Sequence, residues 1–282
     1  MRTLRYVLCD VFTEQPLTGN SLAVFTNPNK LSTATMQALA REMNLSESSF
    51  VFPPESGGHA RIRIFTPRVE LPFAGHPTLG TAFVIGTGVQ LDVLQLETGA
   101  GTVPVRLERD GARVAFGWMT QPLPKVVPYE ATTELLSALG VAGSELPVVA
   151  YDNGARHVFV MLASREAVAS LKPDMNRLSA LPSSGVNVFT GAGSEYKTRM
   201  FHPGAGVAED PATGSAAGPL AAHLAQHGSI PFGETIRIEQ GTELERPSVL
   251  YARAHGTQAA LTQVEVGGSA VIVARGEFRL PM

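Results

Sequence analysis

Cysteine is almost absent from this sequence of 282 residues, in which Cys9 is the only one. One thiol can form neither an intrachain disulfide nor a thiolate metal cluster, so both are excluded. Cys9 lies in the apolar run 6–12 (YVLCDVF), which favours a small buried hydrophobe over a reactive group.

Long runs of one residue class are also absent. There is no run of Lys or Arg and the net charge is −3, so we expect no nucleic-acid partner. No stretch approaches the ~20 apolar residues of a membrane helix, and the first residues do not resemble a signal peptide. These absences predict a cytoplasmic protein with no membrane partner.

Cofactor motifs are missing as well. No strand-like run leads into a G-x-G-x-x-G or a Walker loop, which argues against a nucleotide cofactor. His223 and His227 are four residues apart, but Leu224 occupies the glutamate position of the zincin motif. We therefore expect no metal and no organic cofactor.

The composition of the chain is typical of a globular protein with many short helices and strands. Apolar residues make up 44% of the chain and charged residues 17%, enough for well-filled cores. The 28 Gly and 20 Pro are scattered singly, as expected where turns separate many strands. A chain of this length suits two lobes of ordinary domain size.

Hydrophobic periodicity predicts more strands than helices. The predicted helices are 32–43, 78–85, 133–139, 164–171 and 213–226. The predicted strands are 4–11, 21–25, 59–65, 91–97, 102–108, 112–117, 147–150, 157–162, 186–190 and 196–201, with four more between 235 and 280. A proline-rich connector at 121–128 sets the boundary between lobes 1–120 and 121–282, with the last strand free to return to the N-terminal lobe.

The two halves share a pattern. The segment 63–67 (RIFTP) resembles 199–203 (RMFHP), and 70–76 (ELPFAGH) resembles 209–215 (EDPATGS). Each copy then enters an apolar helix of small residues. Two copies in register indicate a duplicated strand–loop–helix unit rather than a coincidence of edge-strand chemistry.

The duplication has a chemical consequence at the two helix starts. Each predicted helix follows a glycine, Gly75 or Gly214, and the first N–H groups of a helix lack intrahelical partners. The helix dipole adds positive charge there, and glycine allows a close approach. Two such ends facing one cleft would bind a carboxylate or a developing enolate.

At these residues the sequence resembles the PhzF-like family of phenazine biosynthesis, within the diaminopimelate epimerase superfamily. The resemblance covers essentially the whole chain, and the motifs in order are specific. They are 10–13 (DVFT), 16–20 (PLTGN), 44–51 (NLSESSFV), 71–80 (LPFAGHPTLG) and 209–220 (EDPATGSAAGPL).

The resemblance implies an α+β fold of two pseudo-symmetric lobes, each a β-barrel-like sheet around a central helix, with the active site between them. It implies a homodimer with no metal or organic cofactor, acting on a small carboxylate-bearing substrate. The implied catalytic residues are Glu47, His76, Asp210 and Ser215, and the implied substrate-binding residues are Gly75, Gly214 and Asn20.

Three positions depart from the wider superfamily. Ala74 and Thr213 stand where diaminopimelate epimerases and proline racemases carry two facing cysteines, so two-cysteine chemistry is excluded. Glu245 stands where the family often has glycine, a departure confined to one loop.

The site residues also have structural interpretations. Glu47 and Ser215 could be helix caps, His76 could be a buried structural residue, and the role of Asp210 could be no more than to form a turn. Glu47 precedes the apolar residues 50–52 (FVF), where partial desolvation would raise the pKa of its carboxyl group toward a useful range. We therefore favour an isomerase in which Glu47 moves a proton; a lyase with the same base and a non-catalytic metabolite-binding protein are the alternatives.

Overall fold

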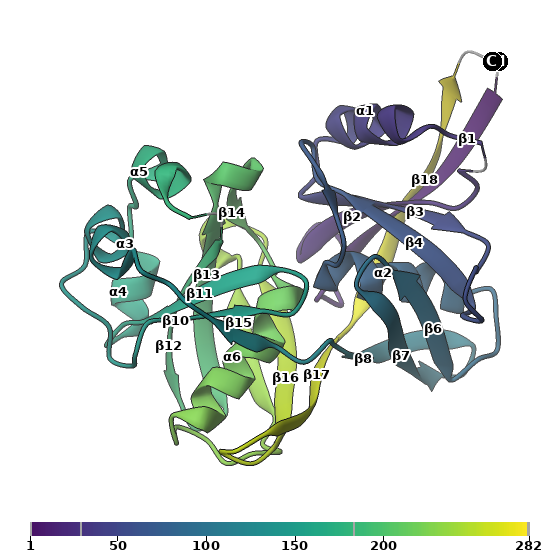
Figure 1. Ribbon diagram of the computed structural model, residues 1–282. Helices are drawn as coiled ribbons and strands as arrows, with labels where there is room; N and C mark the ends of the chain where they lie inside the picture. The colour runs from purple at the N-terminus through teal and green to yellow at the C-terminus, as the bar shows by residue number, and fades with distance from the viewer. Residues whose placement is uncertain (1, 29, 183, 281–282) are drawn as a thin grey trace. The chain divides into compact units, whose positions relative to one another are not determined.

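The computed structural model describes residues 2–28, 30–182 and 184–280 (Figure 1). Over these residues the chain is a mixed α/β fold with a large sheet and few helices. It divides into two compact units, one of residues 1–120 with 267–282 and the other of residues 121–266. In the described part of the chain, no helix is long and apolar enough to cross a membrane.

The first unit wraps strands around one helix. Its elements are β1 (Arg2–Val11), β2 (Asn20–Phe25), α1 (Thr33–Met43), β3 (Glu47–Phe52), β4 (Ala60–Phe65), β5 (Glu70–Leu71), α2 (Gly75–Gly86), β6 (Val93–Thr98), β7 (Gly101–Asp110), β8 (Arg113–Thr120) and β18 (Ala270–Leu280). β1 pairs antiparallel with both β2 and β18. β2 runs parallel to β3, and β4 runs parallel to β6.

The helix α2 is the centre of this unit. It packs against β1, β2, β3, β6, β7, β8 and β18, and its residues from Gly75 to Phe83 are all buried. A helix that is apolar all round is stable only when it is enclosed. Glycine permits the close approach: a Cβ on Gly80 would lie 2.6 Å from Val11 and 2.7 Å from Leu22.

The second unit also packs strands against a buried helix. Its elements are β9 (Lys125–Val127), α3 (Thr132–Leu139), β10 (Val149–Asp152), β11 (Arg156–Met161), α4 (Arg165–Ala169), α5 (Met175–Ala180), β12 (Gly185–Ala192), β13 (Glu195–His202), η1 (Pro203–Ala205), β14 (Val207–Asp210), α6 (Gly214–Gln226), β15 (Ile236–Gln240), η2 (Thr242–Leu244), β16 (Ser248–Gly256) and β17 (Leu261–Gly268). β11 runs parallel to β12, and β13 runs parallel to β15. α6 packs against β11 and β16, and it is buried from Gly214 to Ala225.

A proline inside α6 is accommodated by a neighbouring side chain. Pro219 has no N–H to offer the carbonyl of Ser215, its partner four residues earlier. That carbonyl instead accepts a hydrogen bond of 3.0 Å from Asn153 Nδ2. The Gly214 carbonyl likewise accepts one of 2.8 Å from Gln121 Nε2. These two side-chain amides therefore donate hydrogen bonds to two carbonyl groups in the first turn of α6 from outside the helix.

The duplicated sequence pattern is matched by duplicated contacts within each unit. Arg63 binds Glu70 through two nitrogens at 2.7 and 2.6 Å, and Arg199 binds Glu209 in the same way at 2.8 and 2.8 Å. The guanidinium carbon lies 5.2 Å from the ring of Phe65 in the first case and 5.0 Å from the Phe201 ring in the second.

Several elements differ from the sequence-based expectation. The proline-rich connector contains the short strand β9, α5 was not predicted, and α2 begins three residues before the predicted start at 78. The last strand, β18, makes the return that the sequence analysis left open: it pairs with β1, and residues 267–282 belong to the first unit. Periodicity alone could not show this, because strand pairing over such a sequence distance leaves no local pattern.

Candidate active site

Glu47 is the first residue of β3, directly after α1. The helix ends at Asn44, which takes the left-handed conformation with φ 50° and donates its N–H to Ala40. Because Asn44 supplies this cap, the interpretation of Glu47 as a capping residue is wrong. Its side chain is 13% exposed, so the carboxylate is largely desolvated but still reachable from solvent.

His76 lies against Glu47. It is the second residue of α2, its side chain is 3% exposed, and its Nδ1 lies 3.3 Å from Glu47 Oε2 and 3.2 Å from Asn20 Nδ2. The structure thus brings three of the residues expected in the site together within the first unit. Burial lowers the pKa of His76 to about 3, against a smaller opposing effect of a hydrogen bond with the Ser21 backbone.

A neutral His76 changes the meaning of its contact with Glu47. At neutral pH the imidazole carries no charge, so the contact is a close approach of two polar groups rather than an ion pair. A favourable contact between Oε2 and Nδ1 requires one proton between them, held by the carboxyl group or by the ring.

The other ring nitrogen of His76 points to a ligand. Nε2 is buried and has no hydrogen-bond partner among the described residues. A buried polar atom without a partner costs about 1–3 kcal/mol, so such an atom in a native protein calls for an explanation. A bound substrate would supply the missing partner.

Both glycines predicted to bind substrate are the first residues of their helices. Gly75 opens α2 behind Ala74, and Gly214 opens α6 behind Thr213. Neither Ala74 nor Thr213 caps its helix with a side chain, so the first N–H groups have no such partner. The two positions that would hold cysteines in a two-cysteine epimerase are thus the two N-cap positions.

Asp210 forms part of a buried polar cluster before α6. Its Oδ2 accepts a hydrogen bond of 2.6 Å from the Thr213 hydroxyl, and its carbonyl accepts one of 2.7 Å from Gln240 Nε2. Asp210 is 4% exposed and lies at the end of β14. Asp210 therefore fixes the loop that leads into α6. The interpretation of Asp210 as a turn former agrees with this position but did not include its hydrogen bonds to Thr213 and Gln240.

Ser215 has a partner that sequence reasoning missed. It is the second residue of α6 and not its cap, and its Oγ lies 2.9 Å from Nε2 of His157 in β11. His157 Nδ1 in turn lies 3.3 Å from Asn187 Nδ2 in β12. Burial, with a smaller contribution from the neighbouring His202, lowers the pKa of His157 to about 3.

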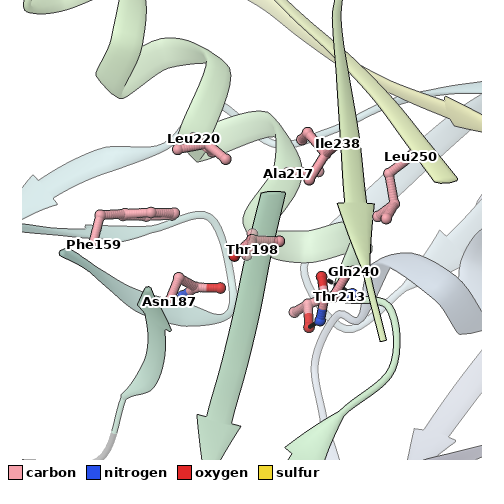
Figure 2. Close-up of a pocket in the computed structure, with 10 residues that line it drawn as sticks. Phe159, Asn187, Thr198, Thr213, Ala217, Leu220, Ile238, Gln240 and Leu250 are labelled. Atoms are coloured by element: carbon pink, nitrogen blue, oxygen red, sulfur yellow. Dashed lines mark hydrogen bonds between the residues drawn. The ribbon is translucent and has the colours of Figure 1, made fainter. Parts of the chain in front are cut away.

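A small cavity lies beside α6, within the second unit (Figure 2). Its volume is about 10 Å³, room for about one water molecule and too little for a metabolite. It is lined by Phe159, Asn187, Thr198, Thr213, Ala216, Ala217, Leu220, Ile238, Gln240 and Leu250. Figure 2 shows Gln240 beside Thr213, the pair that closes the Asp210 cluster.

Metal ligands do not gather in the described residues. No group of three or more His, Cys, Asp or Glu side chains there could hold an ion. Cys9 is fully buried, and this burial raises the pKa of its thiol far above the usual value. The interpretation of Cys9 as a small buried hydrophobe is confirmed.

The arrangement of these motifs agrees with comparisons to known proteins. A family model described as "Phenazine biosynthesis-like protein" matches residues 9–276. The chain belongs to this family. The match spans the site residues of both units.

The relatives specify the type of enzyme. The chain is 52% identical over 276 residues to trans-2,3-dihydro-3-hydroxyanthranilate isomerase of Pseudomonas aeruginosa, covering 98% of this chain and 99% of that protein. It is 51% identical over 275 residues, with the same coverage, to the Pseudomonas fluorescens isomerase of that name. The chain is therefore an enzyme, an isomerase of the phenazine biosynthesis-like type.

A solved structure supports the fold. A PhzF-family phenazine biosynthesis protein of Bacillus anthracis superposes with a TM-score of 0.86 at 24% identity, covering 99% of this chain and 100% of that one. At this identity the likeness speaks for the fold alone.

Proposed function

We propose that this isomerase moves a proton on trans-2,3-dihydro-3-hydroxyanthranilate, with Glu47 as the acid/base group and without a cofactor. The substrate follows from the relatives that share about half of their residues with the chain. It carries a carboxylate, in agreement with the small acidic metabolite predicted from the helix starts. An isomerisation conserves atoms, so a proton removed from one carbon must return elsewhere on the molecule.

The observation that carries the proposal is the contact between Glu47 and His76. A carboxylate at 13% exposure, 3.3 Å from a neutral imidazole, is largely desolvated yet reachable, as a group that takes up and releases a proton needs to be. Asn20 orients the ring through the same Nδ1. The names of the relatives favour an isomerase over the lyase and over the non-catalytic binding protein.

The second unit has a different part in the proposal. Ser215 is the second residue of α6 and Asp210 lies at the end of β14, just before this helix start, where the helix dipole favours negative charge. We assign to Ser215 and the Gly214 N–H the binding of an anionic oxygen of the substrate. The proposal includes pseudo-symmetry of the two units, supported by the repeated Arg–Glu and Arg–Phe contacts.

The test replaces Glu47 by Gln, which keeps size and hydrogen-bonding atoms but removes the titrating group. The turnover number for trans-2,3-dihydro-3-hydroxyanthranilate should fall by roughly 10²–10⁴-fold, while substrate affinity and melting temperature stay close to wild type. Turnover of Glu47→Gln within a few-fold of wild type would overturn the assignment.

A second measurement addresses the absence of a cofactor. Activity should survive exhaustive chelation and dialysis of the purified enzyme. Loss of activity together with a stoichiometric metal or nucleotide, and its recovery on adding that group back, would contradict the proposal.

A further inference from the structure

The pair formed by Ser215 and His157 has two possible directions. The distance of 2.9 Å between Oγ and Nε2 is what a nucleophilic serine and its general base would show. It is equally what a histidine N–H donating to the serine oxygen would show. The direction decides whether Ser215 attacks the substrate or donates a hydrogen bond to it.

Asn187 fixes the direction. Its Nδ2 lies 3.0 Å from the carbonyl oxygen of Gly185 and 3.4 Å from that of Val158. Carbonyl oxygens only accept hydrogen bonds, so the atom facing them is the amide nitrogen and not the oxygen. The same nitrogen lies 3.3 Å from His157 Nδ1, and because an amide nitrogen only donates, Nδ1 cannot be a donor in this contact and faces it as an acceptor.

A ring nitrogen that accepts carries no proton in the neutral imidazole, so the proton of His157 is on Nε2. Nε2–H then donates to Ser215 Oγ. Ser215 and His157 are 6% and 4% exposed, and within the described chain Ser215 Oγ has no other hydrogen-bond partner. The serine proton is thereby turned away from His157 and is available to a ligand.

The backbone is shaped around this arrangement. A Cβ on Gly185 would lie 2.5 Å from His157 Nδ1, so only glycine leaves the imidazole in its place. Asn153 holds the Ser215 carbonyl at 3.0 Å, which fixes the first turn of α6. The His157 ring, the Asn187 amide and the start of α6 are therefore each held in place by contacts within the protein, without a substrate.

We propose that His157, held in its Nε2–H tautomer by Asn187, is a positioning residue that makes Ser215 a hydrogen-bond donor to an anionic oxygen of the substrate. Ser215 is then neither a nucleophile nor a proton acceptor in the reaction. The inference rests on the proposed function for the identity of the substrate, but the tautomer and the direction of the hydrogen bond do not depend on it.

The first experiment reads the tautomer without substrate. In the wild-type enzyme labelled with ¹⁵N-histidine, two-bond ¹H–¹⁵N spectra at pH 7 should show His157 with a protonated Nε2 and a bare Nδ1. The His157 signals are assigned by their loss in His157→Gln. A protonated Nδ1, or an imidazolium, would overturn the proposal. Because no turnover is measured, failure of Glu47 as the base would leave this result unaffected.

The second experiment is a double-mutant cycle on isomerase activity with trans-2,3-dihydro-3-hydroxyanthranilate. Ser215→Ala should reduce kcat/KM by roughly 10–10³-fold, the effect of losing one donor to developing charge. His157→Leu should cause a similar loss, and the double variant should lose no more than the larger single loss. Losses that multiply would show that His157 does not act through Ser215.

Matched variants keep this cycle interpretable. His157→Gln places an amide N–H near the position of Nε2 and should recover much of the activity that His157→Leu loses. His59→Gln, at an exposed histidine, should leave activity unchanged. A fluorophosphonate probe for nucleophilic serines should not label Ser215; labelling at this residue would overturn the proposal even if the variants failed to fold.

Discussion

The two units place polar side chains at corresponding positions, but these side chains differ in their chemistry. In the first unit Glu47 of β3 pairs with Leu22 of β2, and in the second Asn187 of β12 pairs with Phe159 of β11. Both strand pairs are parallel. Two residues before Leu22 on β2 lies Asn20, which contacts His76, the second residue of α2. Two residues before Phe159 on β11 lies His157, which contacts Ser215, the second residue of α6.

The two resulting sets are Asn20, Glu47 and His76 in the first unit and His157, Asn187 and Ser215 in the second. The carboxylate of one set corresponds to an amide in the other, so only the first set contains a group that can take a proton from carbon at neutral pH. The second set is a neutral chain of hydrogen bonds. In the proposed mechanism the first set supplies the acid/base group and the second set supplies a fixed hydrogen-bond donor.

The largest expected effect concerns the buried histidines of the two sets. His76 and His157 each have a pKa of about 3, against 6.5 for the exposed group. Between these values the unfolded chain binds protons that the folded chain excludes, so stability falls as pH drops below 6.5. Each histidine contributes ~1.4 kcal/mol per pH unit to this slope.

Urea denaturation between pH 7 and pH 4 measures that slope. His76→Gln and His157→Gln should each reduce it by about one proton, with His59→Gln as the control for an exposed histidine. If the slope were unchanged in His76→Gln alone, His76 would be charged beside Glu47 in the folded protein. The first set would then contain an ion pair, and the second would not.

The next effect compares the two Arg–Glu pairs. Arg199 and Glu209 are 8% and 11% exposed, whereas Arg63 and Glu70 are 23% and 37% exposed. Arg199→Met leaves a buried carboxylate without its partner and should cost about 3–5 kcal/mol of unfolding free energy. Arg63→Met should cost at most about 1 kcal/mol, because water screens the exposed pair. Equal losses in chemical denaturation would contradict this difference in burial.

A smaller effect tests how the second set is held at its helix. Asn153→Ala should cost about 1–3 kcal/mol, because Pro219 cannot satisfy the Ser215 carbonyl. In a Pro219→Ala background the helix regains an N–H for that carbonyl, and the cost of Asn153→Ala should shrink. The same loss in both backgrounds, measured by denaturation, would show that the hydrogen bond to Ser215 contributes little.

The smallest effect lies in a loop of the second unit. Glu245 adopts φ 56°, the left-handed region that disfavours side chains, and its side chain is exposed. Relief of this strain exceeds the entropic cost of glycine only slightly. Glu245→Gly should therefore stabilise the protein by about 0.5–1 kcal/mol. A lower melting temperature in this variant would mean that Glu245 makes a favourable contact.

Much of the fold was predictable because the signals are local. Ser32, the first residue of the predicted helix 32–43, caps α1 by accepting from the Thr35 N–H at 3.1 Å. The Arg–Phe–Pro repeat located both central helices. The short strands β5 and β14 were not predictable, since two to four residues carry no periodicity.

The site was predictable only where motifs named it. Glu47, His76 and Asn20 are in contact, as expected of an active site. His157 and Asn187 were missed because a histidine and an asparagine inside apolar strands look like ordinary interior residues. The internal duplication contained the missing signal, because an alignment of β11 with β2 would have shown that His157 is the equivalent of Asn20.

The most direct test of the account follows the proton itself. The isomerisation is run in deuterium oxide with trans-2,3-dihydro-3-hydroxyanthranilate, and solvent deuterium on carbon is measured in recovered substrate and product by mass spectrometry. Wild-type enzyme and Ser215→Ala should both incorporate solvent deuterium, the variant more slowly, while Glu47→Gln should incorporate it at least ~100-fold more slowly than wild type. Incorporation by Glu47→Gln at the wild-type rate would contradict the assignment of proton transfer to the first set, and would direct attention to Asp210.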